Sequence, residues 1–213
     1  MNEKNQLGFI HKFIPSEGSS KDKNSLTLLL LHGTGGDETD LIPIARMLEI
    51  TNASILSPRG KVIENGMPRY FRRLAEGIFD IEDLKFRTNE LADFVQNASK
   101  TYALDLNRIV AIGYSNGANI AASVLLLRPK ILSNAILFRP MIPLVPNTLP
   151  NLSSKRVLIS AGLHDPIVAS YQTEDLFDLL EKVGAKVSIQ WQNSGHELTQ
   201  RDMIAARKWL SLL

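Results

Sequence analysis

Short apolar runs alternate with longer segments of helical period along this chain. Most of the apolar runs are rich in leucine, isoleucine and valine, as strands that are buried on both faces of a sheet are. The segments between them place apolar residues three and four positions apart, which is typical of helices that cover a sheet. The pattern predicts the α/β class, with a mainly parallel sheet of about seven strands flanked by helices. The predicted strands are residues 9–14, 26–31, 54–57, 108–113, 135–137, 156–161 and 186–191, and the predicted helices are residues 40–48, 81–101, 116–127, 168–183 and 197–212.

The chain is expected to form one domain over residues 1–213. Its 213 residues favour one domain over two at about 150 residues per domain, and neither a repeat nor a flexible linker divides them. Residues 58–80 are the one long stretch without clear periodicity. A loop of that length in a compact domain is usually functional or disordered, so we expect one of these two roles for it.

Composition and charge exclude several kinds of partner and site. The formal net charge is +2, from 24 Lys and Arg against 22 Asp and Glu, and this excess is too small to predict binding to nucleic acid or to an anionic membrane. The absence of cysteine excludes disulfides, thiol nucleophiles and cysteine-ligated metal sites. The polar start lacks the apolar stretch of a secretory signal, and no apolar run approaches the length of about 18 residues that a membrane span needs. We therefore expect a soluble, cytoplasmic protein.

Residues 113–117, Gly-Tyr-Ser-Asn-Gly, match the pattern G-x-S-x-G. In this motif the serine sits on a strained turn between a strand and a helix. Glycines flank the serine because the strand end and the helix start approach too closely for a β-carbon. The bare pattern is weak evidence, but here a predicted strand precedes it and an apolar predicted helix follows it, as the motif requires. Ser115 is therefore the candidate nucleophile.

A serine nucleophile needs a histidine base and a carboxylate that orients this base. After a serine on such a turn, the partners follow in the order Asp or Glu, then His, each on a loop behind a later strand. Asp165 follows the predicted strand 156–161, and His196 follows the predicted strand 186–191. All three side chains then converge at the carboxyl ends of the strands, so we predict the triad Ser115, Asp165 and His196. The competing acids are Glu174, Asp175 and Asp178 on the following predicted helix.

A glycine-rich loop supplies a fourth element. The apolar run 28–31 leads directly into His-Gly-Thr-Gly-Gly-Asp at residues 32–37. Such a loop can direct the backbone N–H of Thr34, together with the N–H of Asn116 after the nucleophile, at an oxyanion. Thr34 and Asn116 are therefore the candidate oxyanion hole.

These elements resemble those of the α/β-hydrolase fold, in the carboxylesterase and phospholipase-like family. The resemblance covers nearly the whole chain, from LLLLHGTGGDETDL through GYSNGANIA and GLHDPIV to SGHEL. The run PRG…YFRRLAEGIFDIEDL is similar to that of small bacterial esterases, some of which are named for induction by hydroquinones or catechols. The resemblance implies the triad and the oxyanion hole named above, and no cofactor. Ala118 stands where many relatives carry a second glycine after the motif, a departure that bears on helix packing and not on the chemistry.

The sequence leaves little room for a lid. Larger relatives insert helices after the strand that follows the nucleophile helix, and these helices close over the site. Here the corresponding residues 138–155 are few and include four prolines, so no lid domain fits. We expect a fairly open cleft between residues 139–145 and residues 58–80.

Each candidate also has a structural interpretation. Ser115 and His196 can lie at helix starts, and Asp165 can occupy a turn before a proline, without any catalytic role. That interpretation leaves the joint order and placement of the elements unexplained. His32 in the glycine-rich loop is more often structural than catalytic, and His164 should point away from the site if Asp165 points in. His11, in a predicted strand, is interpreted as a satisfied or exposed side chain.

Four arginines gather in or beside the aperiodic residues 58–80: Arg59, Arg69, Arg72 and Arg73. They could bind an anionic substrate, but ion pairs with carboxylates are the more common use of such residues. The expected partners are Glu76, Asp80 and Glu82. Nearby Met67, Phe71 and Phe79 are interpreted as packing residues, some of which can line an acyl or alcohol pocket.

The sequence thus predicts a serine hydrolase that cleaves carboxylic esters of small or medium size through an acyl-enzyme. The substrate is a small-molecule ester, and the sequence shows no cluster of metal ligands. Thioester, lysophospholipid or carbon–carbon hydrolysis uses the same machinery, so the substrate stays open. A non-catalytic ligand-binding protein of the same fold is the alternative from another class. No nucleic-acid partner and no membrane span are expected, and a homodimer is left open.

Overall fold

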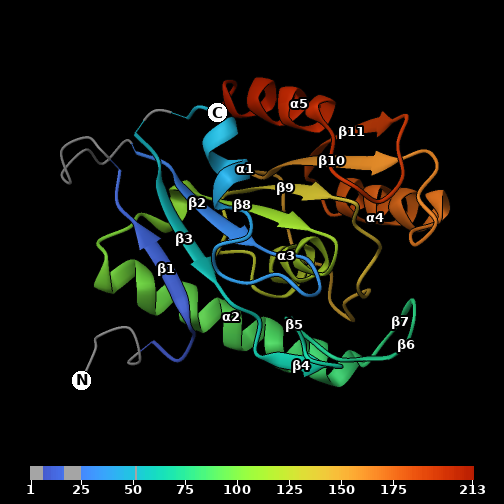
Figure 1. Cartoon of the computed structure of the whole chain (residues 1–213), viewed down its shortest axis with the longest axis horizontal. Helices are drawn as coiled ribbons and strands as arrows, with labels where there is room; N and C mark the ends of the chain where they lie inside the picture. Colours follow the sequence, from blue (N-terminus) through green and yellow to red (C-terminus); the bar gives the residue numbers. More distant parts are fainter. Residues whose placement is uncertain (1–6, 17–24, 51) are drawn as a thin grey trace.

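The computed structural model describes residues 7–16, 25–50 and 52–213, and its centre is a seven-stranded sheet with helices on both faces (Figure 1). The strands are β1 (His11–Ile14), β2 (Thr27–Leu31), β3 (Ser54–Pro58), β8 (Ile109–Tyr114), β9 (Asn134–Phe138), β10 (Arg156–Gly162) and β11 (Lys186–Gln192). They lie in the order β1-β3-β2-β8-β9-β10-β11. β1 pairs antiparallel with β3, and the other pairs of this sheet are parallel. The predicted fold class and strand number are confirmed.

Alternating side chains of the strands form one core on each face of the sheet. Leu28 and Leu30 of β2 belong to a core shared with α1 and α5, whereas Leu29 and Leu31 belong to a core shared with α2, α3 and α4. Figure 1 shows α1 and α5 close together on one side of the sheet. Strands buried on both faces carry apolar residues at every position, which is why the strand runs are continuous in the sequence. The helices are α1 (Ile42–Met47), α2 (Ile81–Thr101), α3 (Asn116–Leu127), α4 (Ser170–Lys182) and α5 (Gln200–Leu210), with a short 3₁₀ helix at Leu106–Arg108.

Element boundaries depart from the prediction where local hydrogen bonds decide them. α5 begins at Gln200 and not at residue 197, because Thr199 caps it. The Thr199 hydroxyl accepts the N–H of Asp202 at 3.4 Å, and the Asp202 carboxylate accepts the N–H of Thr199 at 2.7 Å. β1 begins at His11 and not at residue 9, although Phe9 is buried in the core.

Residues 58–80 form two small hairpins, so the expectation of a loop without regular structure is wrong. β4 (Val62–Glu64) pairs with β5 (Met67–Arg69), and β6 (Arg73–Ala75) pairs with β7 (Ile78–Phe79). Asn65 and Gly66 form the first turn with φ of 51° and 79°, a region that asparagine and glycine adopt more readily than other residues. Strands of two or three residues are too short for an alternating pattern to show in the sequence.

Ion pairs hold these hairpins together, and the predicted partners are only partly right. The predicted Asp80 does pair with an arginine, whereas Glu82 pairs with Lys85 on its own helix. Arg69 and Arg73 share the carboxylate of Glu64 in the first hairpin. Arg59 pairs with Glu38, which precedes α1. The pairs are Arg59–Glu38, Arg69–Glu64, Arg72–Asp80 and Arg73–Glu64.

Residues 139–155 connect β9 with β10 without a helix, as predicted for a fold that lacks a lid domain. Within the described ranges, no helix combines the length and the apolar character that crossing a membrane demands.

Candidate active site

Ser115 occupies a strained turn between β8 and α3. Its φ of 52° and ψ of −115° lie in a region that residues with a β-carbon rarely adopt. The two glycines of the motif are required by close approach: a β-carbon at Gly113 would lie 2.5 Å from the Gly117 carbonyl oxygen, and one at Gly117 would lie 1.9 Å from the Leu31 carbonyl oxygen. The sequence motif therefore folds locally as its mechanics require, with the serine at the carboxyl end of a central strand.

His196 lies between Ser115 and Asp165 and makes a hydrogen bond with each. The His196 Nδ1 is 2.7 Å from Asp165 Oδ2, and His196 Nε2 is 2.9 Å from Ser115 Oγ. A carboxylate only accepts, so Nδ1 carries the ring proton and Nε2 can accept the proton of the serine hydroxyl. The structure thus brings together the three side chains that the sequence predicted.

The loops after β10 and β11 approach each other closely enough to join Asp165 and His196. A β-carbon at Gly162 would lie 2.1 Å from the Gly195 carbonyl oxygen, so only glycine fits there. Asp165 Oδ1 accepts the N–H groups of Ile167 at 2.8 Å and Val168 at 3.0 Å, which leaves Oδ2 for the histidine. The competing acids on α4, Glu174, Asp175 and Asp178, are all exposed to solvent.

The candidate oxyanion donors lie at the start of α3 and in the loop after β2. Asn116 is the first residue of α3, where N–H groups have no partner within the helix. Thr34 lies in the glycine-rich loop after β2, which is fixed by a hydrogen bond from the Gly35 N–H to the Pro68 carbonyl at 2.9 Å. The Asn116 side chain is buried, and its Oδ1 accepts the N–H of Tyr70 at 2.7 Å. The first hairpin therefore supports both the glycine-rich loop and the start of α3.

The other histidines contact neither Ser115 nor Asp165 through a hydrogen bond in the described part of the chain. His32 Nδ1 is 2.6 Å from the Gly33 carbonyl oxygen, and its Nε2 accepts the N–H of Gly60 at 2.9 Å. Burial lowers the pKa of His32, in agreement with a neutral ring that joins two backbone segments. His164 Nε2 is 2.9 Å from Asn193 Oδ1, and His11 is buried between the Phe9 carbonyl and the Tyr102 hydroxyl.

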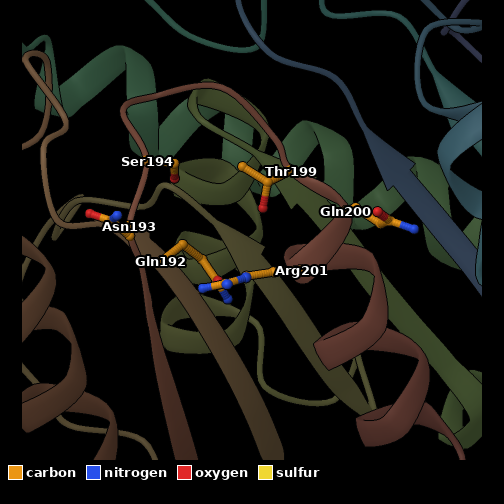
Figure 2. Close-up of a pocket in the computed structure, with 6 residues that line it drawn as sticks. All are labelled: Gln192, Asn193, Ser194, Thr199, Gln200 and Arg201. Carbon is orange, nitrogen blue, oxygen red and sulfur yellow. The ribbon is translucent and has the colours of Figure 1, made fainter.

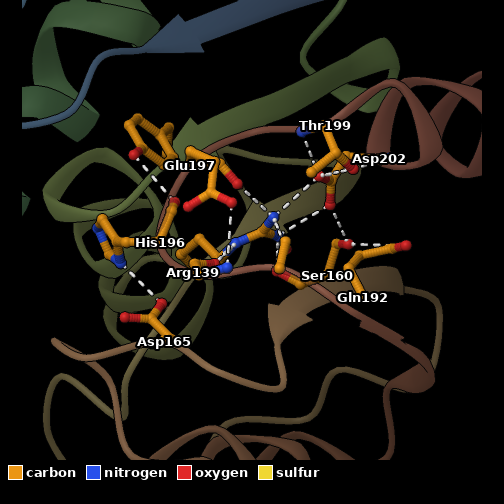
Figure 3. A network of polar contacts seen from close by, with 11 residues as sticks. Arg139, Ser160, Asp165, Gln192, His196, Glu197, Thr199 and Asp202 are labelled. Atoms are coloured by element: carbon orange, nitrogen blue, oxygen red, sulfur yellow. Dashed lines mark hydrogen bonds and ion pairs between the residues drawn. The ribbon is translucent and has the colours of Figure 1, made fainter.

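Two residues near the site were missed by sequence reasoning. Arg139, expected in a cleft wall, is 1% exposed and pairs with buried Asp202 behind the His196 loop (Figure 3). Tyr114 donates from its hydroxyl to the His196 carbonyl at 3.0 Å. Tyr114 ends β8 and Arg139 directly follows β9, so both lie at the carboxyl edge of the sheet. This placement was the available signal in the sequence.

A pocket of about 370 Å³ lies between the end of β11 and the start of α5 (Figure 2). Ser194 and Thr199 of this pocket also contact the Arg139–Asp202 pair. The pocket therefore borders the side chains that contact the His196 loop, and Ser115 is not among its lining residues. It is lined by Gln192, Asn193, Ser194, Thr199, Gln200 and Arg201. Over the part of the chain that the structure describes, no three His, Asp or Glu side chains are grouped so that they could hold a metal ion.

Comparison with known proteins assigns the chain. The sequence profile described as phospholipase/carboxylesterase matches residues 15–213. The chain belongs to the phospholipase/carboxylesterase family. It is therefore a hydrolase, and the family that the sequence resembled is confirmed.

Individual members of the phospholipase/carboxylesterase family agree with this assignment. The chain is similar to the carboxylesterase of Bacillus cereus, with 50% identity and a TM-score of 0.93 over 98% of this chain and 96% of the other. MhqD of Bacillus subtilis, which carries the name of a hydrolase, is 46% identical over 93% of this chain and 96% of its own length, and it fits the bacterial subgroup that the sequence resembled. A carboxylesterase from Mesorhizobium loti is 34% identical, with a TM-score of 0.81 over 87% and 88% of the two chains. The α/β-hydrolase fold is thereby confirmed.

Proposed function

We propose that this hydrolase cleaves carboxylic esters with Ser115 as nucleophile, His196 as general base and acid, and Asp165 as the carboxylate that orients His196. The observation that carries the proposal is the hydrogen-bonded series from Asp165 through His196 to Ser115, at 2.7 Å and 2.9 Å. A serine hydroxyl is a weak nucleophile, and a base within hydrogen-bond distance of its proton is what activates it.

The first half of the reaction acylates the enzyme. Ser115 Oγ attacks the ester carbonyl carbon while His196 Nε2 takes the hydroxyl proton. The N–H groups of Thr34 and Asn116 stabilise the oxyanion of the tetrahedral intermediate. As the carbon–oxygen bond to the alcohol breaks, the alcohol takes the proton back from Nε2 and leaves. Ser115 then carries the acyl group as an ester.

The second half regenerates the enzyme. A water molecule attacks the acyl carbon and gives a proton to His196 Nε2. The second tetrahedral intermediate releases the carboxylic acid, and Ser115 Oγ recovers its proton from Nε2. Asp165 stays ionised throughout and stabilises the imidazolium that forms twice per cycle. The substrates are an ester and water, and no other reactant is consumed.

Labelling with a fluorophosphonate tests this assignment directly. An activated serine attacks the phosphorus and displaces fluoride, which leaves a stable phosphonyl serine. We expect one adduct per chain on Ser115, located by fragmentation mass spectrometry of the tryptic peptide 109–130, and a parallel loss of ester hydrolysis. Protein unfolded in urea is the control, because its Ser115 has no base beside it. Hydrolysis that persists without an adduct, or an adduct on Ser123 of the same peptide, would contradict the assignment.

Short or compact acyl esters are expected to be the preferred substrates. Residues 139–155, where a lid would be inserted, contain no helix. Met67 of the first hairpin is 41% exposed and lies beside Gly35 of the glycine-rich loop, so it can contact a substrate without enclosing it. Phe71, another of the three residues considered for a pocket, is fully buried and packs against the third, Phe79. A methylene contributes about 0.8 kcal/mol only when it leaves water, so an open cleft gains little from long chains.

A series of p-nitrophenyl esters from acetate to palmitate measures this preference. We expect kcat/KM to stop rising by about eight carbons, because further methylenes stay in water. A steady rise beyond that length, by about tenfold for each two methylenes, would show that the acyl chain is buried and would overturn the proposed size preference.

A further inference from the structure

The loop that carries His196 is held by side chains at the carboxyl ends of β8 and β9. The loop lies between β11 and α5, and three consecutive carbonyls in it accept hydrogen bonds (Figure 3). Arg139 Nε donates to the Gly195 carbonyl at 3.1 Å, and Arg139 Nη2 donates to the Glu197 carbonyl at 2.6 Å. Between them, the Tyr114 hydroxyl donates to the carbonyl of His196 itself at 3.0 Å. The backbone is therefore fixed before, at and after the histidine.

Asp202 holds Arg139 in a single orientation. Arg139 Nη1 and Nη2 bond the two Asp202 carboxylate oxygens at 2.8 Å and 2.9 Å, and both side chains are fully buried. Ser160 and Thr199 donate their hydroxyls to the same carboxylate at 2.5 Å and 2.8 Å. Burial alone raises the pKa of Asp202, but these hydrogen bonds hold it below its usual value, so the pair stays ionised. The guanidinium is thus a rigid fork, with Nη1 also donating to the Ser160 carbonyl of β10 and with Nε and Nη2 directed at the loop.

Arg139 also lies next to the nucleophile turn. It follows β9, which lies in the sheet between β8 and β10. Phe138, the residue before it, accepts the N–H of Ser115 at 2.9 Å. Arg139 itself has a φ of 53°, a conformation that is costly for a residue with a β-carbon. β9 carries no member of the proposed triad. The residue at its carboxyl end, Arg139, instead contacts the loop of a triad member.

Stability alone is a poor explanation for this pair. A buried ion pair can often be replaced by apolar residues without loss of stability, because desolvation offsets the attraction between the charges. Catalysis is far more sensitive to geometry, since a displacement of about 1 Å can lower a rate by about 100-fold. We propose that Arg139, anchored by Asp202, and Tyr114 are positioning residues that hold the His196 loop so that Nε2 stays within hydrogen-bond distance of Ser115 Oγ. This inference rests on the proposed role of His196 as the base.

Arg139→Lys keeps the positive charge at position 139 and removes the forked N–H donors of the guanidinium. Lysine can still pair with Asp202, but a single ammonium cannot serve the carboxylate and both loop carbonyls in the planar geometry of a guanidinium. We expect kcat for p-nitrophenyl acetate to fall by about 10- to 100-fold with KM within about twofold of wild type. The rate of fluorophosphonate labelling at Ser115 should fall by the same factor. Tyr114→Phe removes one of the three side-chain hydrogen bonds to the consecutive loop carbonyls. It should also lower kcat and leave KM nearly unchanged, with a smaller loss than Arg139→Lys.

Two further variants keep the test decisive. Tyr102→Phe is the control for Tyr114→Phe, because the Tyr102 hydroxyl is hydrogen-bonded to His11 Nε2 at 2.8 Å at the other edge of the sheet. It should change the midpoint of urea unfolding and leave kcat and labelling unchanged. The double variant Arg139→Met/Asp202→Asn removes both charges together and keeps an oxygen that can accept the Thr199 N–H of the α5 cap, so it should fold even where Arg139→Lys does not. Its kcat should also fall by at least tenfold.

A folded Arg139→Lys or double variant with wild-type kcat and labelling rate would overturn the proposal and leave the triad intact. Failure of the proposed function has a different signature, because wild-type protein itself would then carry no adduct on Ser115.

Discussion

Replacing Ser115 with alanine is expected to lower kcat for ester hydrolysis by about 10⁶-fold, because loss of the nucleophile disables the whole triad. The residual rate comes from the oxyanion hole and from substrate binding alone. Alanine keeps the β-carbon that the turn already accommodates at a φ of 52°, so the backbone has no reason to rearrange. Steady-state kinetics with p-nitrophenyl acetate, together with urea unfolding, measure both expectations.

Ser123→Ala is the matched control for this variant. Ser123 is buried on the same helix, α3, and its hydroxyl donates to the Asn119 carbonyl at 2.9 Å. It lies outside the triad, so its removal should leave kcat unchanged. Turnover of Ser115→Ala within tenfold of wild type would show that another group is the nucleophile.

Replacing Asp165 with asparagine is expected to lower kcat by about 10⁴-fold. Asp165 Oδ2 now accepts from His196 Nδ1, whereas the asparagine amide donates, so it stabilises the tautomer whose Nε2 carries the proton. That Nε2 can no longer take the serine proton. The asparagine oxygen can still accept the N–H groups of Ile167 and Val168, so the loop should keep its conformation. Kinetics and the rate of fluorophosphonate labelling check the expected loss.

The acids of α4 provide the control for Asp165. Asp175 is exposed on that helix, and Asp175→Asn should therefore have wild-type kinetics. If Asp165→Asn were close to wild type while replacement of Glu174, Asp175 or Asp178 abolished activity, the acid of the triad would have been assigned wrongly.

The sheet and the convergence of the three side chains could be predicted because both depend on patterns that are local in the chain. Strands buried on both faces must be apolar at every position, and β8 and β10 appear in the sequence within one residue of their observed bounds. The side chains of Ser115, Asp165 and His196 each follow a predicted parallel strand. Parallel strands end at the same edge, so their loops had to meet.

The hairpins of residues 58–80 were missed because their strands have only two or three residues, too few for an alternating pattern to show. Asn65-Gly66 was the available signal, since this dipeptide favours the tight turn that joins β4 to β5. The start of α5 was also open to prediction from Thr199 and Asp202, three residues apart.

The buried partner of Arg139 could not be read from the chain. Asp202 is 63 residues away, and a charged residue after a strand is exposed far more often than it is buried. Burial of Arg139 depends on a partner that comes close only when the whole sheet and α5 have folded. A sequence pattern records the period of an element, and it carries no signal for a pair between two elements that are distant in the chain.

The order of strands also determines when hydrolysis can begin during folding. Ser115 and His196 are 81 residues apart in the chain, and β9 and β10 separate their strands in the sheet. Parallel strands pair only after a long crossover has closed, so contacts of this kind form late and slowly. In a half-formed sheet, Ser115 therefore lacks the base that we propose for it. Recovery of activity after dilution from denaturant should report the pairing of β10 with β11, while the helical signal reports earlier, more local steps.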